Sequence, residues 1–232
     1  SFSGKIDAIE TAQRIPLNVE ITSINGESLT EENVAEGSIT AIDPDKTVDR
    51  MVVMEEYTGA WCGWCPRGMV GMEKLVEEYP DNFIPIAVHA NDIMQEAAFN
   101  DLLASYSGGF PGSVLNRMKQ VDPYYGSTNG TPFGIDNNIL PMMYTLTEAA
   151  VDIEGAEIDR EAGKVKVTAS ATFSIDCNLK DAPYCFSYVI TEDGVNGKDL
   201  PASQRKDYLQ SNYFSGNSQY TSDPYLKHLT SM

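Results

Sequence analysis

A Cys-x-x-Cys motif between an apolar strand and an amphipathic helix constrains this sequence more than any other feature. The motif, residues 61–66 (WCGWCP), follows a predicted strand at residues 51–57 that opens with four apolar residues. It precedes residues 66–79, whose apolar side chains recur at helical spacing. Unpaired N–H groups and the helix dipole stabilise a thiolate at such a helix start. We therefore predict a redox-active disulfide with Cys62 as an exposed nucleophile and Cys65 as the resolving cysteine.

Two other interpretations of this pair are an idle disulfide and half of a zinc site. Zinc needs two further soft or imidazole ligands, and the sequence offers only His89, His228 and a distant second pair, Cys177 and Cys185. We expect no metal, and no cofactor besides the Cys62–Cys65 disulfide. Cys177 and Cys185 flank a predicted hairpin loop, so they form either a structural disulfide or two buried thiols.

The charge balance argues against nucleic-acid binding. The 232 residues include 34 Asp and Glu against 16 Lys and Arg, which gives a formal net charge of −18. Phosphate backbones are bound by clustered Lys and Arg, so an acidic chain repels them. No apolar run approaches the roughly 18 residues of a membrane-spanning helix, and we expect no transmembrane segment.

The order of the predicted elements indicates an α/β domain over residues 49–146. Strands and helices alternate there, which is typical of a sheet with a parallel element. After residue 147 the apolar period changes to two, so we expect an antiparallel β-sandwich over residues 147–232, including a strand at 184–190. Residues 1–48 are interpreted as an N-terminal extension or the tail of an upstream β domain. The elements predicted within the α/β domain are residues 51–57, 66–79, 83–89, 93–106, 113–116 and 135–146.

The motif and its context resemble the thioredoxin superfamily. Strand, Trp-Cys-x-x-Cys, helix, strand and helix follow one another in the order of that fold. Pro111 lies where thioredoxin-like proteins carry a cis-proline. The resemblance implies a cis Phe110–Pro111 bond that faces the two sulfurs, with the Phe110 backbone binding an extended substrate. An ordinary trans turn is the alternative.

The same resemblance gives roles to the residues around the cysteines. Glu56 lies where thioredoxins keep a buried acid, which implies a general base for Cys65; a structural carboxylate is the alternative. Glu55 is on the opposite face of the strand, so we expect one of the two acids to be solvated. Trp61 and Trp64 are interpreted as an apolar rim that docks a partner strand, or as a shield for the disulfide.

A closer resemblance covers most of the chain. The runs 55–68 (EEYTGAWCGWCPRG), 88–92 (VHAND) and 111–117 (PGSVLNR) look like the outer-membrane-protein (Omp) related thioredoxin-like family of Bacteroidetes. That resemblance implies an appended β-sandwich and an exported protein, often a lipoprotein, in the periplasm, outer membrane or cell surface. The weak strands after residue 195 and the short N-terminal stretch depart from a complete member, which suggests truncation at both ends.

These features predict an exported thiol–disulfide oxidoreductase. Its partners are exported cysteine-containing proteins or a membrane thiol donor, with no nucleic acid. The residues between the cysteines tune the potential anywhere from roughly −270 to −120 mV, so reductase, isomerase and oxidase all fit. The alternative is a non-catalytic binding or assembly module of the cell surface on the same scaffold, because fold does not imply function. The acidic charge and 12 Tyr residues favour that alternative mildly.

Overall fold

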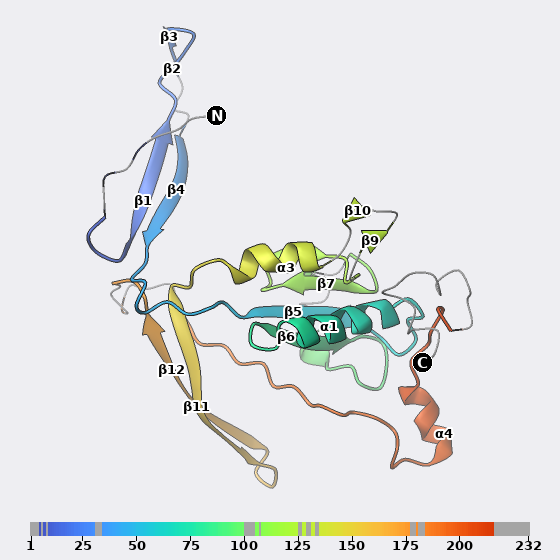
Figure 1. The fold of residues 1–232 in the computed structure, drawn as a ribbon. Helices are drawn as coiled ribbons and strands as arrows, with labels where there is room; N and C mark the ends of the chain where they lie inside the picture. The colour runs from blue at the N-terminus through green and yellow to red at the C-terminus, as the bar shows by residue number, and fades with distance from the viewer. Residues whose placement is uncertain are drawn as a thin grey trace. The chain divides into compact units, whose positions relative to one another are not determined.

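The structure is a computed structural model. It divides the chain into two units, each built from two stretches (Figure 1): a hairpin unit from residues 1–49 and 146–187, and a sheet unit from residues 50–145 and 188–232. The sequence instead predicts three consecutive domains, 1–48, 49–146 and 147–232. The residues that the structure describes are 5, 7, 9–30, 34–99, 105–106, 108–124, 127–128, 131–132, 135–176, 180 and 184–215.

A four-stranded mixed sheet with the order β6-β5-β7-β8 forms the centre of the sheet unit. β5 (Val52–Thr58) is parallel to β6 (Phe83–His89) and antiparallel to β7 (Gly112–Leu115), which pairs with β8 (Lys119–Val121). Helix α1 (Pro66–Glu78) lies between β5 and β6 in the chain, as the apolar periodicity predicts. The other elements of this unit are η1 (Ala97–Phe99), β9 (Ser127–Thr128), β10 (Thr131–Pro132), α3 (Asp136–Met143), α4 (Ala202–Arg205) and η2 (Lys206–Tyr208).

The two longer helices pack against the same face of the sheet. Val52 and Met54 of β5 form the main apolar core with Leu75 of α1 and Ile139 of α3. Because side chains alternate along a strand, Glu56 points to this helix-covered face as well. The opposite face of β5 carries Tyr57, which packs in a second apolar cluster. The predicted strand–helix alternation of this unit is therefore present. The predicted helix 93–106 falls partly outside the described residues.

The hairpin unit consists of separate antiparallel hairpins. β1 (Gln13–Glu20) pairs with β4 (Val34–Ala41), and β11 (Ala149–Asp159) pairs with β12 (Lys164–Phe173). A small hairpin of β2 (Ser23–Ile24) and β3 (Glu27–Ser28) turns at Asn25-Gly26, both at positive φ, as a tight hairpin requires. The Asp43 N–H donates to the Ser174 carbonyl and the Asp176 N–H to the Ala12 carbonyl, at 2.8 and 2.7 Å. These bonds tie the N-terminal stretch to residues 146–187 within the hairpin unit. The three consecutive domains stay a prediction.

The predicted β-sandwich is not confirmed. Residues 184–190 were expected to form a strand, but they carry no strand pairing. Val151 and Ile153 of β11 are 61% and 70% exposed, so no second sheet covers them within the described residues. Period-two alternation defines one apolar face of a strand, but it does not supply the sheet that would cover that face. No helix among the described residues has the length and apolar character needed to cross a bilayer.

Candidate functional site

The two cysteines of the motif form a disulfide at the start of α1. Cys62 and Cys65 are joined with their Cα atoms 5.4 Å apart. Cys65 is the N-cap residue, and Pro66 occupies the first turn, where the missing N–H has no helical partner. The N–H groups of Gly68 and Met69 donate to the Cys65 carbonyl. The predicted position of the pair, between β5 and the first turn of a helix, is thus present.

Glu56 is a buried acid that lies against this first helical turn. Its side chain is fully buried, and both carboxyl oxygens lack a hydrogen-bond partner. A Cβ added at Gly68 would lie 1.9 Å from Glu56 Oε1, so the carboxyl group fills the space that glycine leaves. Burial raises the pKa of Glu56 well above its usual range, and the positive charge of Arg67 offsets this only in part. The group can hold a proton beside the turn that carries Cys65.

The neighbouring acid, Glu55, differs from Glu56 in having a charged partner. It is also buried, so the expectation that one of the two acids is solvated is wrong. The Arg117 guanidinium donates to both Glu55 oxygens, with distances from 2.6 to 3.1 Å. Arg117 follows β7, which pairs with β5, so the pairing of the two strands brings this partner to Glu55. Glu55 is a paired structural charge, whereas Glu56 is the unpaired one.

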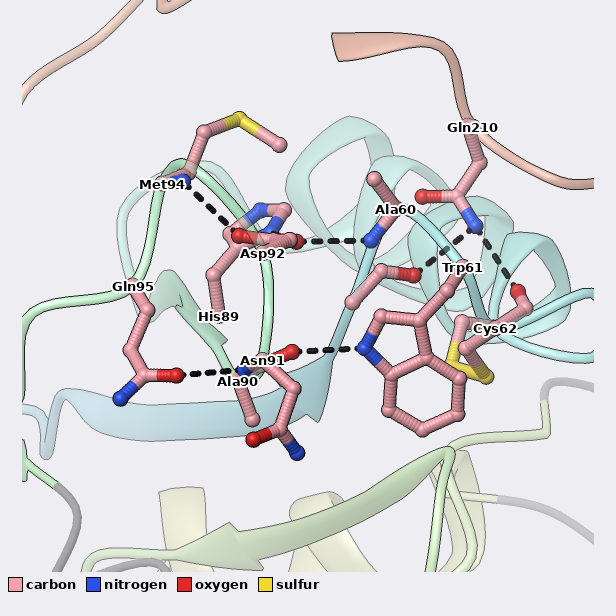
Figure 2. A network of polar contacts seen from close by, with 12 residues as sticks. Ala60, Trp61, Cys62, His89, Ala90, Asn91, Asp92, Met94, Gln95 and Gln210 are labelled. Atoms are coloured by element: carbon pink, nitrogen blue, oxygen red, sulfur yellow. Dashed lines mark hydrogen bonds and ion pairs between the residues drawn. A yellow bond between two sulfur atoms is a disulfide. The ribbon is translucent and has the colours of Figure 1, made fainter. Parts of the chain in front are cut away.

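A carboxylate holds the backbone just before Cys62 (Figure 2). Asp92 Oδ2 accepts the Ala60 N–H and lies 2.7 Å from His89 Nδ1, while Asp92 Oδ1 accepts the Met94 N–H at 2.8 Å. Burial opposes ionisation of Asp92, but these hydrogen bonds hold its pKa below the usual range. The Trp61 indole N–H donates to the Ala90 carbonyl at 2.7 Å. The loop after β6 thereby fixes the approach to the disulfide.

Aromatic side chains flank the motif on two sides. Trp61 makes an edge-to-face contact with Phe110, with ring centroids 5.2 Å apart, and Phe110–Pro111 is a cis peptide bond. The cis bond implied by the resemblance is therefore confirmed. Trp64 makes edge-to-face contacts with Tyr213 and Phe214. Both tryptophans remain partly exposed, as an apolar rim requires.

A segment from the end of the described chain also contacts the motif. The Ser211 N–H donates to the Ala60 carbonyl at 2.7 Å, and the Tyr213 N–H donates to the Gly63 carbonyl at 2.9 Å. Gln210 Nε2 donates to the carbonyl of Cys62 at 2.8 Å (Figure 2). We call residues 210–214 the strap. Sequence analysis misses it, because it lies in a polar stretch without apolar periodicity.

The sulfurs are less accessible than the sequence predicts. Cys62 is 4% exposed and Cys65 is fully buried, so the expectation of an exposed Cys62 is wrong. A shield formed by Trp61 and Trp64 is one of the two interpretations of these residues, whereas no sequence pattern predicts cover by the strap. Cys185 is an exposed free thiol. Its expected partner, Cys177, lies outside the described residues, so a disulfide between Cys177 and Cys185 stays a prediction.

Within the described residues, no cluster of three or more His, Cys, Asp or Glu side chains could hold a metal ion. The groups that the site itself supplies are the disulfide, the protonatable Glu56 and the loop anchored by Asp92.

Comparison with known proteins adds little to this geometry. No protein-family model matches the chain, and no curated protein matches it significantly. Among solved structures, part of the chain is similar to HBP35 of Porphyromonas gingivalis, at 26% identity and a TM-score of 0.36. The similarity covers 47% of this chain and only 38% of that one. A TM-score of this size does not establish a shared fold.

Proposed function

We propose that this chain is a thiol–disulfide oxidoreductase of thioredoxin-like fold that acts on protein cysteines through Cys62 and Cys65. One observation carries the proposal: a Cys-x-x-Cys disulfide begins a helix whose first turn lies against a buried, unpaired carboxyl group. An unpaired buried acid costs stability, and strongly perturbed carboxyl groups cluster at functional sites. The parallel β5–β6 pair, connected through α1, supports the proposed fold.

The proposed reaction is a two-step exchange. A thiolate of the partner attacks Cys62 Sγ, the Cys62–Cys65 bond breaks, and a mixed disulfide forms while Cys65 leaves as a thiolate. A second thiolate of the partner then attacks the partner sulfur of that mixed disulfide and releases Cys62. Two electrons pass from the partner to the pair, and the partner becomes a disulfide. The reverse sequence oxidises the pair and reduces the partner.

Glu56 has a proposed role in the protonation of Cys65. With its raised pKa, the carboxyl group keeps a proton that it can give to the Cys65 thiolate as the disulfide opens. The same group takes the proton back when Cys65 attacks to close the disulfide. Cys62 is the proposed nucleophile, and the exposed faces of Trp61 and Trp64 with the backbone of Phe110 would bind the partner.

The compartment and partners rest on the family resemblance. We propose an exported protein of the periplasm or cell surface, carried as a lipoprotein at the outer membrane. Its partners would be exported cysteine-containing proteins or a membrane thiol donor. The potential would decide between the reductase, isomerase and oxidase directions.

The second candidate is a non-catalytic binding or assembly module. It is favoured by a specific observation, the 4% exposure of Cys62. A nucleophile that partners cannot reach does not turn over, so on this account the disulfide would only stabilise the start of α1.

Insulin reduction and the oxidation of a dithiol peptide distinguish the two candidates. We expect the wild type to catalyse at least one of them, and Cys62→Ser and Cys65→Ser to lose that activity. Cys185→Ser is the matched control, because Cys185 is an exposed thiol outside the sheet unit. A wild type without either activity would favour the binding module.

A further inference from the structure

The burial of Cys62 is at odds with open access of a protein partner. Thiol–disulfide exchange requires an incoming sulfur to reach the attacked sulfur directly. Cys62, the proposed point of attack, is only 4% exposed. The neighbouring Trp61 and Trp64 are by contrast 46% and 44% exposed. Cys62 is therefore buried locally, while its neighbours in the motif stay partly exposed.

The strap binds the motif through main-chain hydrogen bonds. Its alternate residues Ser211 and Tyr213 donate their N–H groups to the carbonyls of Ala60 and Gly63. These are main-chain acceptors on either side of Cys62. The strap thus occupies two main-chain acceptors beside Cys62.

Side chains of the strap also contact the motif. Gln210 Nε2 donates to the carbonyls of Gly59 and Cys62, at 3.2 and 2.8 Å. A Cβ added at Gly63 would lie 2.4 Å from the Tyr213 ring, which shows how closely that ring covers the residue after Cys62. Two side-chain hydrogen bonds and one ring therefore add to the two main-chain bonds that hold the strap against the motif.

Phe214 anchors the strap at its C-terminal end. Phe214 is 1% exposed and packs with Val70 and Tyr124 in an apolar cluster. At the other end, Leu209 is 69% exposed, and the Tyr213 side chain is itself largely at the surface. Phe214 can thus stay in its pocket while the hydrogen bonds of residues 210–213 open.

We infer that the strap is a specificity-determining element that favours small thiols over protein dithiols at Cys62. This inference rests on the proposed function for its biological meaning. A small thiol needs only a narrow path to Cys62 Sγ. A protein dithiol brings backbone and side chains that compete with the strap for the Ala60 and Gly63 carbonyls, so it must displace residues 210–213 first.

The test compares the reduction of the Cys62–Cys65 disulfide by a small and by a large reductant. The oxidised full chain is treated with dithiothreitol or with a reduced thioredoxin, and the opening of the pair is followed by mass-resolved alkylation. In Gln210→Ala/Tyr213→Ala we expect the rate with thioredoxin to rise at least about tenfold, because the bonds that close the strap are lost. The rate with dithiothreitol should rise by less than about threefold.

Two further variants separate access from general loosening. Leu209→Ala, next to the strap but exposed, should leave both rates unchanged. Gln210→Ala alone should give a smaller rise with thioredoxin, and it removes no ring packing that folding could need. The equilibrium potential of the pair should match the wild type in each variant.

The inference is overturned if the strap variants react with thioredoxin at the wild-type rate. It is also overturned if both reductants accelerate by the same factor, because that indicates a loosened motif rather than selective access. The readout is independent of catalysis. A protein that fails in the insulin and peptide assays but shows selective acceleration contradicts the proposed function and leaves the strap inference standing.

Discussion

The hairpin unit and the sheet unit each contain a poorly solvated carboxyl group, and the two groups have opposite surroundings and opposite pKa shifts. In the hairpin unit, Glu148 accepts hydrogen bonds from Arg14, Tyr184 and Thr40. The bond from Arg14 contributes most, burial opposes it, and together the partners lower the pKa of Glu148 to about 2. In the sheet unit, Glu56 lacks any hydrogen-bond partner, and burial raises its pKa.

The difference shows which acid is structural and which serves chemistry. A carboxylate paired with a guanidinium holds elements together. An unpaired buried one costs stability and keeps a proton that it can exchange. The sheet unit contains both kinds side by side on β5, because Glu55 is paired with Arg117 while Glu56 is not. Only the unpaired acid lies against the turn that carries Cys65.

Replacing Glu56 and Glu148 by Gln, one at a time, should give the largest difference in exchange rate. Glu56→Gln removes the proton carrier, so we expect a fall of about a hundredfold in the rate of exchange at Cys65, a typical contribution of general acid–base catalysis. Glu148→Gln should leave that rate unchanged, since it lies in the other unit. Stopped-flow oxidation of the reduced protein measures both. Equal rates for wild type and Glu56→Gln would make Glu56 a structural carboxylate.

A methyl group added beside Glu56 should destabilise the sheet unit. In Gly68→Ala the new Cβ overlaps Glu56 Oε1, and we expect a loss of about 1–3 kcal/mol, typical of overpacking. The matched control is Gly155→Ala in β11, where nothing lies within 4 Å of the added Cβ. Urea unfolding followed by tryptophan fluorescence reports the sheet unit, because Trp61 and Trp64 are the only tryptophans. If Gly68→Ala has the same urea midpoint of unfolding as the wild type, the close contact between Gly68 and Glu56 does not limit stability.

Removing the anchor of the loop before Cys62 should have an intermediate effect. Asp92→Asn leaves one acceptor oxygen on the side chain. That oxygen can accept from the Ala60 N–H or from the Met94 N–H, but not from both while the side chain still contacts His89. We expect Asp92→Asn to lower kcat in the insulin assay about tenfold with little change in KM, as for a positioning residue. Asp122→Asn, which loses only a partly exposed pair with Arg67, is the control. If the two variants have the same kcat, Asp92 does not position the loop.

The smallest expected effect is an opposite pH dependence of stability. The pKa of Glu148 is depressed in the folded state, so its contribution is present above pH 4.5 and is lost as the pH falls toward about 2. The pKa of Glu56 is raised, so its favourable contribution is present below pH 4.5 and is lost as the pH rises through the folded value.

Unfolding free energies of both Gln variants between pH 2.5 and 8 measure these contributions. Relative to Glu148→Gln, the wild type should lose stability toward low pH. Relative to Glu56→Gln, it should lose stability toward high pH. If the two differences in unfolding free energy, wild type minus variant, change with pH in the same direction, the contrast between the units is contradicted.

Local patterns in the sequence were sufficient to predict the scaffold of the site. The apolar run before the motif predicts β5, and the helical spacing after it predicts α1, because both depend on residues close in sequence. The resemblance to a known family added the cis bond before Pro111.

The contacts that complete the site join residues far apart in the sequence. Arg117 meets Glu55 only because β7 pairs with β5, and no pattern within either strand indicates it. The strap reaches Cys62 across 148 residues through hydrogen bonds from a polar segment. The expected sandwich is not confirmed for a related reason, since alternation in β12 does not determine what packs against it.

The central claim, that Cys62 and Cys65 are a working redox pair, is tested most directly by their reduction potential. The pair is equilibrated in glutathione buffers and read by mass-resolved alkylation, which separates it from Cys177 and Cys185. We predict a potential between roughly −270 and −120 mV, the range of thioredoxin-like enzymes. A pair that stays oxidised below about −300 mV would be a structural disulfide and would contradict the claim.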